Sequence, residues 1–464
     1  MQKHFVLIAI LLAMLLTTGC TTNNKTKSSQ VIEPIQVDVP LRPEGQKDVL
    51  ELRTPKIDTV RVGFIGLGSR GSGAVQRYVH IPGAKIVALC DIYEENVEKT
   101  QAILDKAGLP RATGYSGSED AWKQLCESDQ VDLVYIATDW KNHAKMMIYA
   151  MEQGKHVACE VPAAMTLDEI WAIIDTAERT QKHAMQLENC VYDFFELTTL
   201  NMAQQGVFGE VLHVEGSYIH NLNNNWERYV NDWRLQYNKE FRGDVYPTHG
   251  IGPVAQVLNI HRGDRMKTLV SMDTKPVNLP EYLIEKRGVD RDSAYNFANG
   301  QHTMTMISTE NGKTLQIQHD VTSPRPYSRM YQVSGTKGYA NKYPVEGYAI
   351  EDEGQGFSSH DFLSQDNMNM LMDKYKHRIH RELEEKAKEV GGHGGMDFIM
   401  DYRLIYCLRN GLPLDMDVYD LAEWCSLVEL SRISIENNNS PVAIPDFTRG
   451  NWNRIQGYSH AFAD

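Results

Sequence analysis

The sequence of 464 residues predicts an α/β protein, with an N-terminal Rossmann domain followed by an α+β domain that has a largely antiparallel open sheet. Residues 60–71 read VRVGFIGLGSRG, an apolar strand that runs directly into a glycine turn and then a helix. Asp91 stands at the end of the next apolar strand. Later strand-like segments follow one another in runs, which is typical of an α+β layer.

The glycine turn predicts a dinucleotide site. In the G-x-G-x-x-G pattern, Gly66 permits the tight bend, Gly68 lets backbone amides approach the phosphates, and Gly71 allows the helix to pack closely on the strand. The helix N-terminus adds a partial positive charge. A carboxylate at Asp91 can accept hydrogen bonds from ribose hydroxyls and repels a 2′-phosphate, so NAD is expected rather than NADP.

The next segments alternate between helix and strand patterns, which predicts a doubly wound parallel sheet. Strands are expected over 85–90, 131–138, 156–160 and 184–188, with helices over 94–107, 118–126, 142–153 and up to 181 after a capping box at 166–169. Ligands gather at the carboxyl ends of such strands. The side chains expected beside the nicotinamide are those of Trp140, His143, Glu160, Val161 and Asn189.

The second half predicts strands over 211–218, 302–308, 314–319 and 331–334, and helices over 192–205, 377–390, 396–410 and 418–436. Between these helices, residues 391–395 read GGHGG, which predicts either a mobile lid or a plain loop.

The N-terminus predicts export. Residues 1–20 combine a short basic start, an apolar run and a small residue before Cys20, as in a lipoprotein signal peptide whose cysteine is acylated. An uncleaved anchor would also leave the protein outside the cytoplasm.

Residues 21–58 lack apolar periodicity and predict a tether, followed by a Rossmann domain over 59–190 and a substrate-binding domain over 191–464. The expected location is the bacterial cell envelope, on its periplasmic or surface face.

The amino-acid composition argues against some classes of binding partner. The formal net charge of −14 and the absence of a clustered basic stretch argue against nucleic acid. The cysteines after Cys20 form no C-x-x-C pair and predict buried thiols, and no histidine or cysteine cluster has metal-ligand spacing.

At the strand ends the chain resembles the glucose-fructose oxidoreductase and inositol dehydrogenase superfamily, which carries Thr-Pro-x-x-x-His and Glu-Lys-Pro there. The corresponding segments here are TDWKNH at 138–143 and EVP at 160–162. Val161 replaces the lysine that helps to move the alcohol proton in ordinary dehydrogenases, which argues against a simple dehydrogenase.

The resemblance sharpens to glycoside hydrolase family 109, the NAD-dependent α-N-acetylgalactosaminidases. Matching segments run from about Val60 to beyond Met416 and include GLGSRG, WxxH, EVP, EN at 188–189, GSYIH, DWR, YPTHGIGPVA, RGD, PRPYSR, GTKG and GGMDF. The chain departs from the family at Asn221, at Asp244, where Asn is expected, and in the length of the segment 223–230.

The family resemblance implies two sets of contacts. The NAD contacts are Gly66, Gly68, Ser69, Arg70, Gly71, Asp91, Trp140, Lys141, Asn142, His143, Glu160, Val161, Asn189 and Tyr246. The substrate contacts are Tyr218, Arg234, Tyr246, Pro247, Thr248, His249 and Tyr327. The substrate is a glycan with a terminal N-acetylgalactosamine.

An exported enzyme has no reliable supply of fresh dinucleotide, which favours a cycle that consumes none. If tightly bound NAD removes a hydride from C3 of the sugar, the C2 proton becomes acidic and the C1 oxygen can leave by elimination. Water then adds, and the hydride returns to C3. NAD-dependent enzymes of this kind are exceptions to the two-carboxylate mechanism of most glycosidases.

Three residues are the catalytic candidates. His249, placed by the superfamily resemblance, is expected to handle the C3 hydroxyl proton, because imidazole titrates near neutral pH. Glu160 and Tyr192 are the candidates for the C2 proton and the leaving oxygen. Their alternatives are a carboxylate that positions the cofactor and a core aromatic residue, and the alternative for Arg234 is a surface ion pair.

Two other functions remain open from the sequence, an NAD-dependent sugar dehydrogenase and a non-catalytic carbohydrate-binding lipoprotein. A homodimer formed through the open sheet is a further expectation, by analogy with many relatives.

Overall fold

The computed structural model describes residues 32–351 and 360–461. The predicted signal peptide and Cys20 therefore lie outside the described residues. From Pro34 onward the described chain forms one compact unit, which is built around two sheets.

The first sheet is parallel throughout and confirms the predicted Rossmann architecture. Its strand order is β3-β2-β1-β4-β5-β6, so the order reverses between β1 and β4, where doubly wound folds bind their ligands. The strands are β1 (Val60–Ile65), β2 (Ala84–Cys90), β3 (Thr113–Tyr115), β4 (Leu133–Ile136), β5 (His156–Cys159) and β6 (Ala184–Gln186).

The helices that alternate with these strands are α2 (Ser69–Tyr78), α3 (Glu94–Lys106), α4 (Ala121–Glu127), α5 (Trp140–Glu152) and α6 (Leu167–Thr180). The capping box predicted at 166–169 is confirmed, because the Thr166 side chain accepts from the Glu169 N–H and Glu169 reaches back to the Thr166 backbone. The sequence predicts a helix over 72–78 after the glycine turn, and the observed helix α2 begins three residues earlier, at Ser69, with Gly68 as its N-cap.

The second sheet is mixed, with the order β13-β12-β11-β7-β10-β9-β8-β14. Among the described strands of this second sheet, only the β7–β10 pair is parallel, which fits the expected largely antiparallel sheet. The strands are β7 (Val211–Ile219), β8 (Met266–Asp273), β9 (Thr303–Thr309), β10 (Thr314–Asp320), β11 (Gln332–Gly335), β12 (Gly338–Asn341), β13 (Gly347–Ile350) and β14 (Val442–Ala443).

Helices cover one face of this sheet. Helix α9 packs on β7 and α15 on β8, while the alternating burial along β9 leaves Met304 and Met306 exposed on the other face. The helices of this half are α7 (Phe194–Gln204), α8 (Trp233–Glu240), α9 (Thr248–Val257), α10 (Asn278–Arg287), α11 (Arg291–Tyr295), α12 (Gln365–Lys374), α13 (Arg378–Val390), α14 (Met396–Asn410) and α15 (Val418–Glu436). The 3-10 turns are η1 (Asn189–Tyr192), η2 (Trp226–Arg228), η3 (Val230–Asp232), η4 (His393–Gly395) and η5 (Ser459–Ala461).

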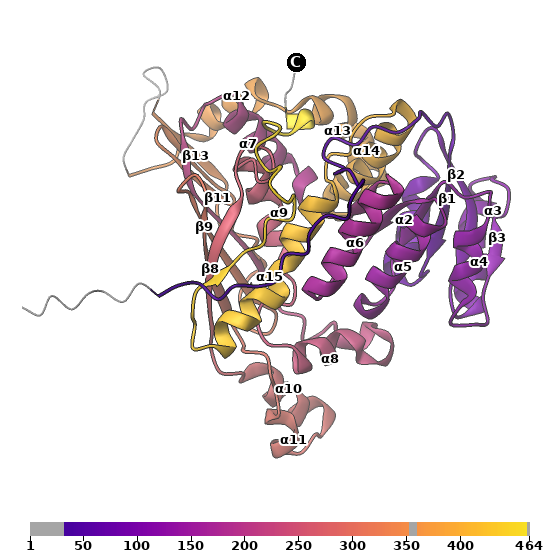
Figure 1. The fold of residues 1–464 in the computed structure, drawn as a ribbon, viewed down its shortest axis with the longest axis horizontal. Coiled ribbons are helices and arrows are strands. Elements are labelled where there is room, and N and C mark those ends of the chain that lie inside the picture. Colours follow the sequence, from indigo (N-terminus) through magenta and orange to yellow (C-terminus); the bar gives the residue numbers. More distant parts are fainter. Residues whose placement is uncertain (1–31, 352–359, 462–464) are drawn as a thin grey trace, which may run out of the picture. The chain divides into compact units, whose positions relative to one another are not determined.

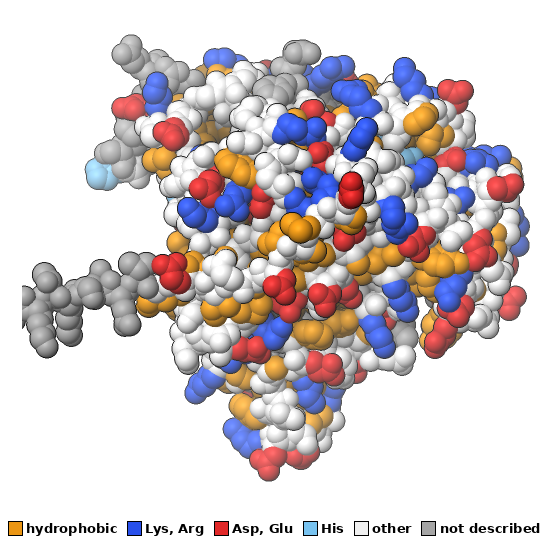
Figure 2. All heavy atoms as spheres, in the orientation of Figure 1, with side chains coloured by type: hydrophobic (Ala, Val, Ile, Leu, Met, Phe, Trp, Pro, Cys, Tyr) orange, Lys and Arg blue, Asp and Glu red, His pale blue; other side chains and the backbone are white. Residues whose placement is uncertain are grey.

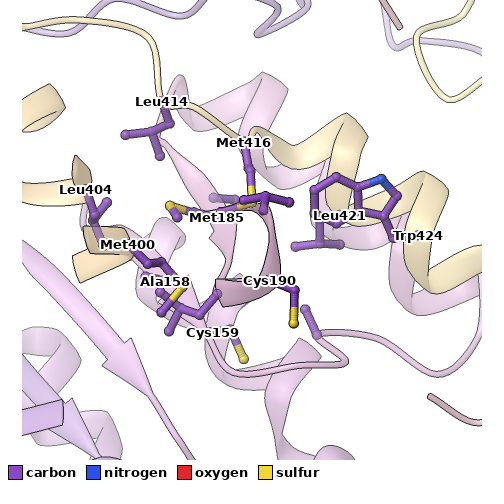
Figure 3. Close-up of a cluster of buried hydrophobic side chains, with 14 of the residues drawn as sticks. Ala158, Cys159, Met185, Cys190, Met400, Leu404, Leu414, Met416, Leu421 and Trp424 are labelled. Atoms are coloured by element: carbon purple, nitrogen blue, oxygen red, sulfur yellow. The ribbon is translucent and has the colours of Figure 1, made fainter. Parts of the chain in front are cut away.

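The core is continuous across residue 190, where the sequence predicted a domain boundary. Helix α14 packs on α2, and α15 packs on α6, so the last two long helices lie beside the first sheet (Figure 1). Figure 3 shows Cys159 and Met185 of the first sheet meeting Met400 and Leu404 of α14 in one buried cluster. The two sheets are therefore fixed to each other through α14 and α15.

The segment 34–58 is not a tether in the structure. Ile35 exchanges two backbone hydrogen bonds of 2.8 Å with Pro441 and Ala443, and Val49 and Leu50 are buried. The Arg42 guanidinium binds the buried Glu178 carboxylate at 2.8 and 3.0 Å. We call the segment 34–58 the strap. The sequence did not indicate its packing, because an extended segment shows no helical or strand-like period of apolar residues and its partners lie in distant parts of the chain.

The charged side chains are mixed on the surface (Figure 2), and the thiols are buried. On the face drawn in Figure 2, basic and acidic side chains are interspersed. The six cysteines of the described chain are free and buried. Within residues 32–351 and 360–461, no helix is long and apolar enough to cross a bilayer.

Candidate active site

The three glycines of the turn after β1 have different surroundings. Gly66 has a φ of +85°, and a Cβ atom there would lie 2.5 Å from the Ala137 carbonyl oxygen. A Cβ atom on Gly71 would lie 1.8 Å from the carbonyl oxygen of Gly66, so only glycine allows this packing. At Gly68 no described atom lies within 4 Å of such a Cβ, which leaves the backbone open. These features fit the pyrophosphate of NAD.

Asp91 lies beside this turn at the end of β2. Its Oδ2 accepts from the Leu67 N–H at 2.7 Å, and its Oδ1 accepts from the Tyr93 N–H at 3.0 Å and from Asn96 Nδ2 at 3.2 Å. The carboxylate is thereby fixed where dinucleotide folds bind the ribose hydroxyls.

His249 lies in the first turn of α9 and is paired with a carboxylate. Its Nδ1 lies 2.7 and 2.8 Å from the two oxygens of Glu188, which follows β6 and is fully buried. Burial opposes ionisation of Glu188, but the His249 ring and the Cys190 N–H hold the pKa of this carboxyl below its ordinary value. With Nδ1 committed to the carboxylate, Nε2 is the nitrogen that can exchange a proton with a ligand.

A glycine makes room for this pair. A Cβ atom on Gly252, one turn further along α9, would lie 3.0 Å from Cγ of Glu188. The same Cβ atom would lie 3.5 Å from the Trp424 ring of α15. The missing side chain at Gly252 therefore leaves space for Glu188 between α9 and its neighbours.

Arg234 lies inside a wall of aromatic rings, and two of these rings, Tyr218 and Tyr246, also contact His249. Its Nη1 donates to the Tyr229 hydroxyl at 2.7 Å and its Nη2 lies 3.5 Å from the Tyr218 hydroxyl. Its Cζ lies 4.6 Å from the centre of the Tyr246 ring and 5.3 Å from that of Trp140. Arg234 is buried, and the charged or polar groups that act on it in the described chain are tyrosines rather than carboxylates, which rules out the surface ion pair that the sequence had left open.

Further side chains connect this wall to His249 and to the outside. The Tyr246 hydroxyl lies 3.5 Å from His249 Nε2, at the limit of a hydrogen bond. The Tyr218 hydroxyl lies 3.0 Å from Nδ1 of His220, whose ring meets Tyr327 edge-on at 5.1 Å. Tyr327 is 40% exposed and forms the rim. The predicted substrate contacts Tyr218, Arg234, Tyr246, His249 and Tyr327 thus lie together.

A second ionic cluster lies beside the glycine turn, and we call it the Asp397 cluster. Arg70 donates to Oε1 of Glu160 at 2.7 and 3.0 Å and to Oδ2 of Asp397 at 3.1 Å. Asp397, in the first turn of α14, also accepts from the Asn189 amide and lies 2.9 Å from Nδ1 of His393. The cluster ties the predicted cofactor residues Arg70, Glu160 and Asn189 to the C-terminal half.

Other predicted cofactor residues shape the strand ends. Trp140 Nε1 donates to the Val161 carbonyl oxygen at 3.2 Å. The ring nitrogens of buried His143 lie 2.8 Å from the Pro162 carbonyl oxygen and 3.1 Å from that of Thr138. Burial lowers the pKa of His143, although both carbonyl oxygens favour the protonated ring. The ring joins the backbone of two strand ends of the site.

The remaining predicted positions lie close by. Ser69 begins α2, Asn142 donates to Asp139, and Lys141 is exposed at the start of α5. Pro247 and Thr248 are buried at the start of α9.

Tyr192 does not fit its predicted catalytic role. Turn η1 ends at Tyr192, and the fully buried side chain donates its hydroxyl to Oδ2 of Asp415 at 3.0 Å. Asp415 in turn binds Arg403. The structure therefore supports the alternative of a core aromatic residue, because the 3-10 turn directs this ring into the interior.

Glu188, Cys190 and His249 place one potential ligand atom each within 4.8 Å of one another. Burial raises the pKa of the Cys190 thiol well above its ordinary value, and the carboxylate is already bound to His249. An acid–histidine pair accounts for this arrangement.

Glu188 and Asp397 are carboxylates of the site that had no role predicted from the sequence. Both stood in recognised segments, the EN at 188–189 and the GGMDF at 394–398. The signal that could have found Glu188 is its position at the carboxyl end of a predicted parallel strand.

Comparison with known proteins identifies both halves. Residues 60–187 match the oxidoreductase family with an NAD-binding Rossmann fold, and residues 192–454 match the C-terminal domain of glycosyl hydrolase 109. Among solved structures, an NAD-binding oxidoreductase from Klebsiella pneumoniae has a TM-score of 0.64 at 16% identity, covering 84% of this chain and 100% of its own. A levoglucosan dehydrogenase in complex with NADH has a TM-score of 0.62 at 17% identity, covering 83% and 99%. These two share the fold.

Full-length relatives are much closer in sequence. Glycosyl hydrolase family 109 protein 1 of Phocaeicola vulgatus is 64% identical, covering 100% of both chains. The protein of the same family from Porphyromonas gingivalis is 65% identical over 93% of each chain. With its NAD-binding Rossmann sheet and its hydrolase C-terminal half, this chain belongs to glycosyl hydrolase family 109.

Proposed function

We propose that the protein is an exported glycosidase that removes terminal α-N-acetylgalactosamine through transient oxidation at C3 with a retained NAD. The observation that carries the proposal is the Glu188–His249 pair, which shares the Tyr218 and Tyr246 rings with buried Arg234 in a chain of a glycoside hydrolase family. The cofactor, when bound, supplies a reversible hydride acceptor. The protein's own residues must therefore manage protons and hold the sugar.

His249 is assigned to the proton of the C3 hydroxyl. Its Nε2 accepts this proton as C3 becomes a ketone and returns it when C3 is reduced again. Glu188 keeps the ring in one tautomer and stabilises its protonated form. The Tyr246 hydroxyl, 3.5 Å from Nε2, lines the same position.

Glu160 is assigned to the C2 proton. Once C3 is a ketone, Glu160 removes this proton, the bond from C1 to the glycosidic oxygen breaks, and Glu160 passes the proton to the leaving oxygen. In the return step Glu160 takes a proton from water as the water oxygen adds at C1, and gives that proton to C2. Both contacts from Arg70 fall on Oε1 of Glu160. If Glu160 only positions the cofactor, its replacement changes NAD binding but not exchange at C2.

Arg234 is assigned to the acetamido oxygen of the sugar. A buried guanidinium without a carboxylate partner in the described chain has hydrogen-bonding capacity for a ligand, and its Nε has no partner there. The surrounding rings offer faces on which a sugar can stack.

The deciding experiment supplies no cofactor. Purified protein is incubated with nitrophenyl α-N-acetylgalactosaminide in deuterated water, and the released sugar is examined by mass spectrometry and NMR. We expect release of nitrophenol, deuterium at C2 and no net NADH, with His249→Gln as the inactive control. Cleavage without exchange at C2 would overturn the mechanism. Accumulation of NADH from free sugar, without cleavage, would instead identify a dehydrogenase.

We also propose anchoring through acylated Cys20, which rests on the sequence of residues 1–20. Cells that express the chain, fed an alkyne-labelled fatty acid, should label the protein and retain it in the membrane fraction. The Cys20→Ser variant should lose the label. Label that persists in this variant would contradict the proposal.

Pairing of two copies through the open face of the second sheet is supported by its exposed apolar side chains, Met272, Met304 and Met306. Sedimentation should give a dimer for the wild-type protein and a monomer for Met304→Lys. A monomeric wild-type protein at micromolar concentration would contradict it.

A further inference from the structure

Arg70 crosses the crevice of the Rossmann sheet. It is the second residue of α2 and lies between Gly68 and Gly71 of the glycine turn, while its partner Glu160 directly follows β5. In the sheet, β4 lies between β1 and β5, so the Arg70–Glu160 ion pair passes over the carboxyl end of β4. Doubly wound folds bind dinucleotides at this switch point.

Asp397 fixes the other side of this bridge. Its carboxylate is 1% exposed and contacts Arg70 at 3.1 Å and His393 at 2.9 Å, together with the Asn189 amide. Burial opposes its ionisation, but the His393 hydrogen bond and the charges of Arg70 and Arg77 hold the pKa of the Asp397 carboxyl well below its ordinary value. Asp397 therefore stays charged at neutral pH.

The glycine loop before α14 is built to reach this carboxylate. Gly392 has a φ of +86°, and a Cβ atom there would lie 2.7 Å from Cβ of Asp397. Gly395 has a φ of +110°, and its Cβ would lie 2.9 Å from the Ala387 backbone. These two glycines let His393, which is half exposed, fold back onto Asp397.

We propose that Asp397 is a cofactor-retention residue, which clamps Arg70 across the crevice and so slows the release of NAD. The inference rests on the NAD use in the proposed function and goes beyond it, because it explains how a cofactor needed in every cycle is kept. NAD can leave only when the Arg70–Glu160 ion pair breaks. Asp397 binds Arg70 from the side of α14 and is itself held by His393, so both residues oppose this step.

The chain offers a matched control one turn along the same helix. Asp401 is fully buried and binds Nε of Arg77 at 2.7 Å, so it also joins α14 to α2. Asp401→Asn weakens the contact between the helices but leaves the contacts of Arg70 intact. Arg70 itself is a poor test, because the family resemblance places it in contact with NAD.

The experiment measures NAD release from the whole protein. Wild type, Asp397→Asn, His393→Ala and Asp401→Asn are loaded with NAD, freed of excess by gel filtration, and mixed with alcohol dehydrogenase and ethanol. This coupled reaction converts released NAD to fluorescent NADH. We expect release about tenfold faster for Asp397→Asn, since a charge-assisted contact is lost, and a smaller increase for His393→Ala. Asp401→Asn should match wild type.

The outcomes separate the explanations. Wild-type release rates in both Asp397→Asn and His393→Ala would overturn the inference, and so would equal acceleration in Asp401→Asn, which indicates general loosening of α14. If Asp397→Asn fails to fold by circular dichroism, His393→Ala decides alone. The assay needs no glycoside, so a failure of the glycosidase proposal leaves it valid. A protein that cannot be loaded with NAD overturns both.

Discussion

The Nδ1 atom of His249 lies 2.7 and 2.8 Å from the two carboxylate oxygens of Glu188, a residue 61 positions earlier in the chain. Glu188 itself is fully buried behind the ring. A carboxylate in this place selects the tautomer in which Nε2 is free and stabilises the charged ring that forms when Nε2 takes a proton. Glu188 is therefore a positioning residue that acts through His249.

Replacing Glu188 should separate proton transfer from binding. We expect Glu188→Gln to lower kcat about 100-fold with little change in KM, because Gln keeps the shape but removes the charge. Glu188→Asp should recover part of the loss. The charged groups and polar rings that surround the His249 ring are those of Glu188, Cys190, Tyr218, His220 and Tyr246.

The checks for Glu188→Gln are the pH profile and an isotope effect. Since the neighbouring negative charge is lost, the acid limb of kcat/KM should move to lower pH. A C3-deuterated substrate should show a larger isotope effect if oxidation becomes slower. An unchanged pH profile together with a raised KM would assign Glu188 a merely structural role.

The buried carboxyl group of Asp244 should make the stability of the folded protein depend on pH. Burial raises the pKa of this carboxyl to about 7, although the Tyr246 N–H donates to it at 3.0 Å. The folded state thus binds a proton that the unfolded state releases near pH 4, so this site lowers stability as the pH rises from about 4 to about 7. Asp244→Asn, the residue expected from the family pattern, has no such titration.

Thermal unfolding at pH 5 and pH 8 tests this prediction. The variant should be more stable than wild type at pH 8, by up to about 4 kcal/mol if the whole shift is expressed, and the difference should shrink at pH 5. Equal differences at both pH values would show that Asp244 is not the titrating group.

The N-terminal strap should contribute to stability. Arg42 joins Arg449 and the Tyr419 hydroxyl on the fully buried Glu178 carboxylate. Arg42→Ala should lower the free energy of unfolding by about 1–3 kcal/mol, because a buried charge loses one of its donors. Leu41→Ala is the control, since Leu41 is 91% exposed. Equal stability of both variants in denaturant unfolding would mean that the strap is dispensable.

The parts of the fold that could be predicted are those coded locally. The strand, glycine turn and helix at 60–78 follow from short-range periodicity, and the helices at 396–410 and 418–436 match α14 and α15 at both ends. The strap at 34–58 and the inward turn of Tyr192 depend on partners far along the chain, which periodicity does not encode.

The candidate site also contains residues that the sequence could predict and residues that only the structure reveals. The glycines and Asp91 carry their own signal, whereas His249 and Arg234 came from a family resemblance. Asp397 lies 327 residues from Arg70 and needed the structure, because only the packing of α14 on α2 brings them together. The aromatic wall around Arg234 likewise joins α5, β7 and α8.

Arg234 has no carboxylate partner among the described side chains, and we expect it to determine substrate choice. Its Nη1 and Nη2 meet only tyrosine hydroxyls among the described side chains, so a ligand oxygen can be bound without breaking an ion pair. Arg234→Lys keeps the charge but loses the planar fork. We expect KM for an N-acetylgalactosaminide to rise at least about tenfold, while KM for the matching galactoside, which lacks the acetamido oxygen, changes little. Steady-state kinetics with the two nitrophenyl glycosides make the comparison, and NAD content measured after gel filtration controls for cofactor loss. A parallel rise for both sugars would place Arg234 on a hydroxyl that they share and remove it from recognition of the acetamido group.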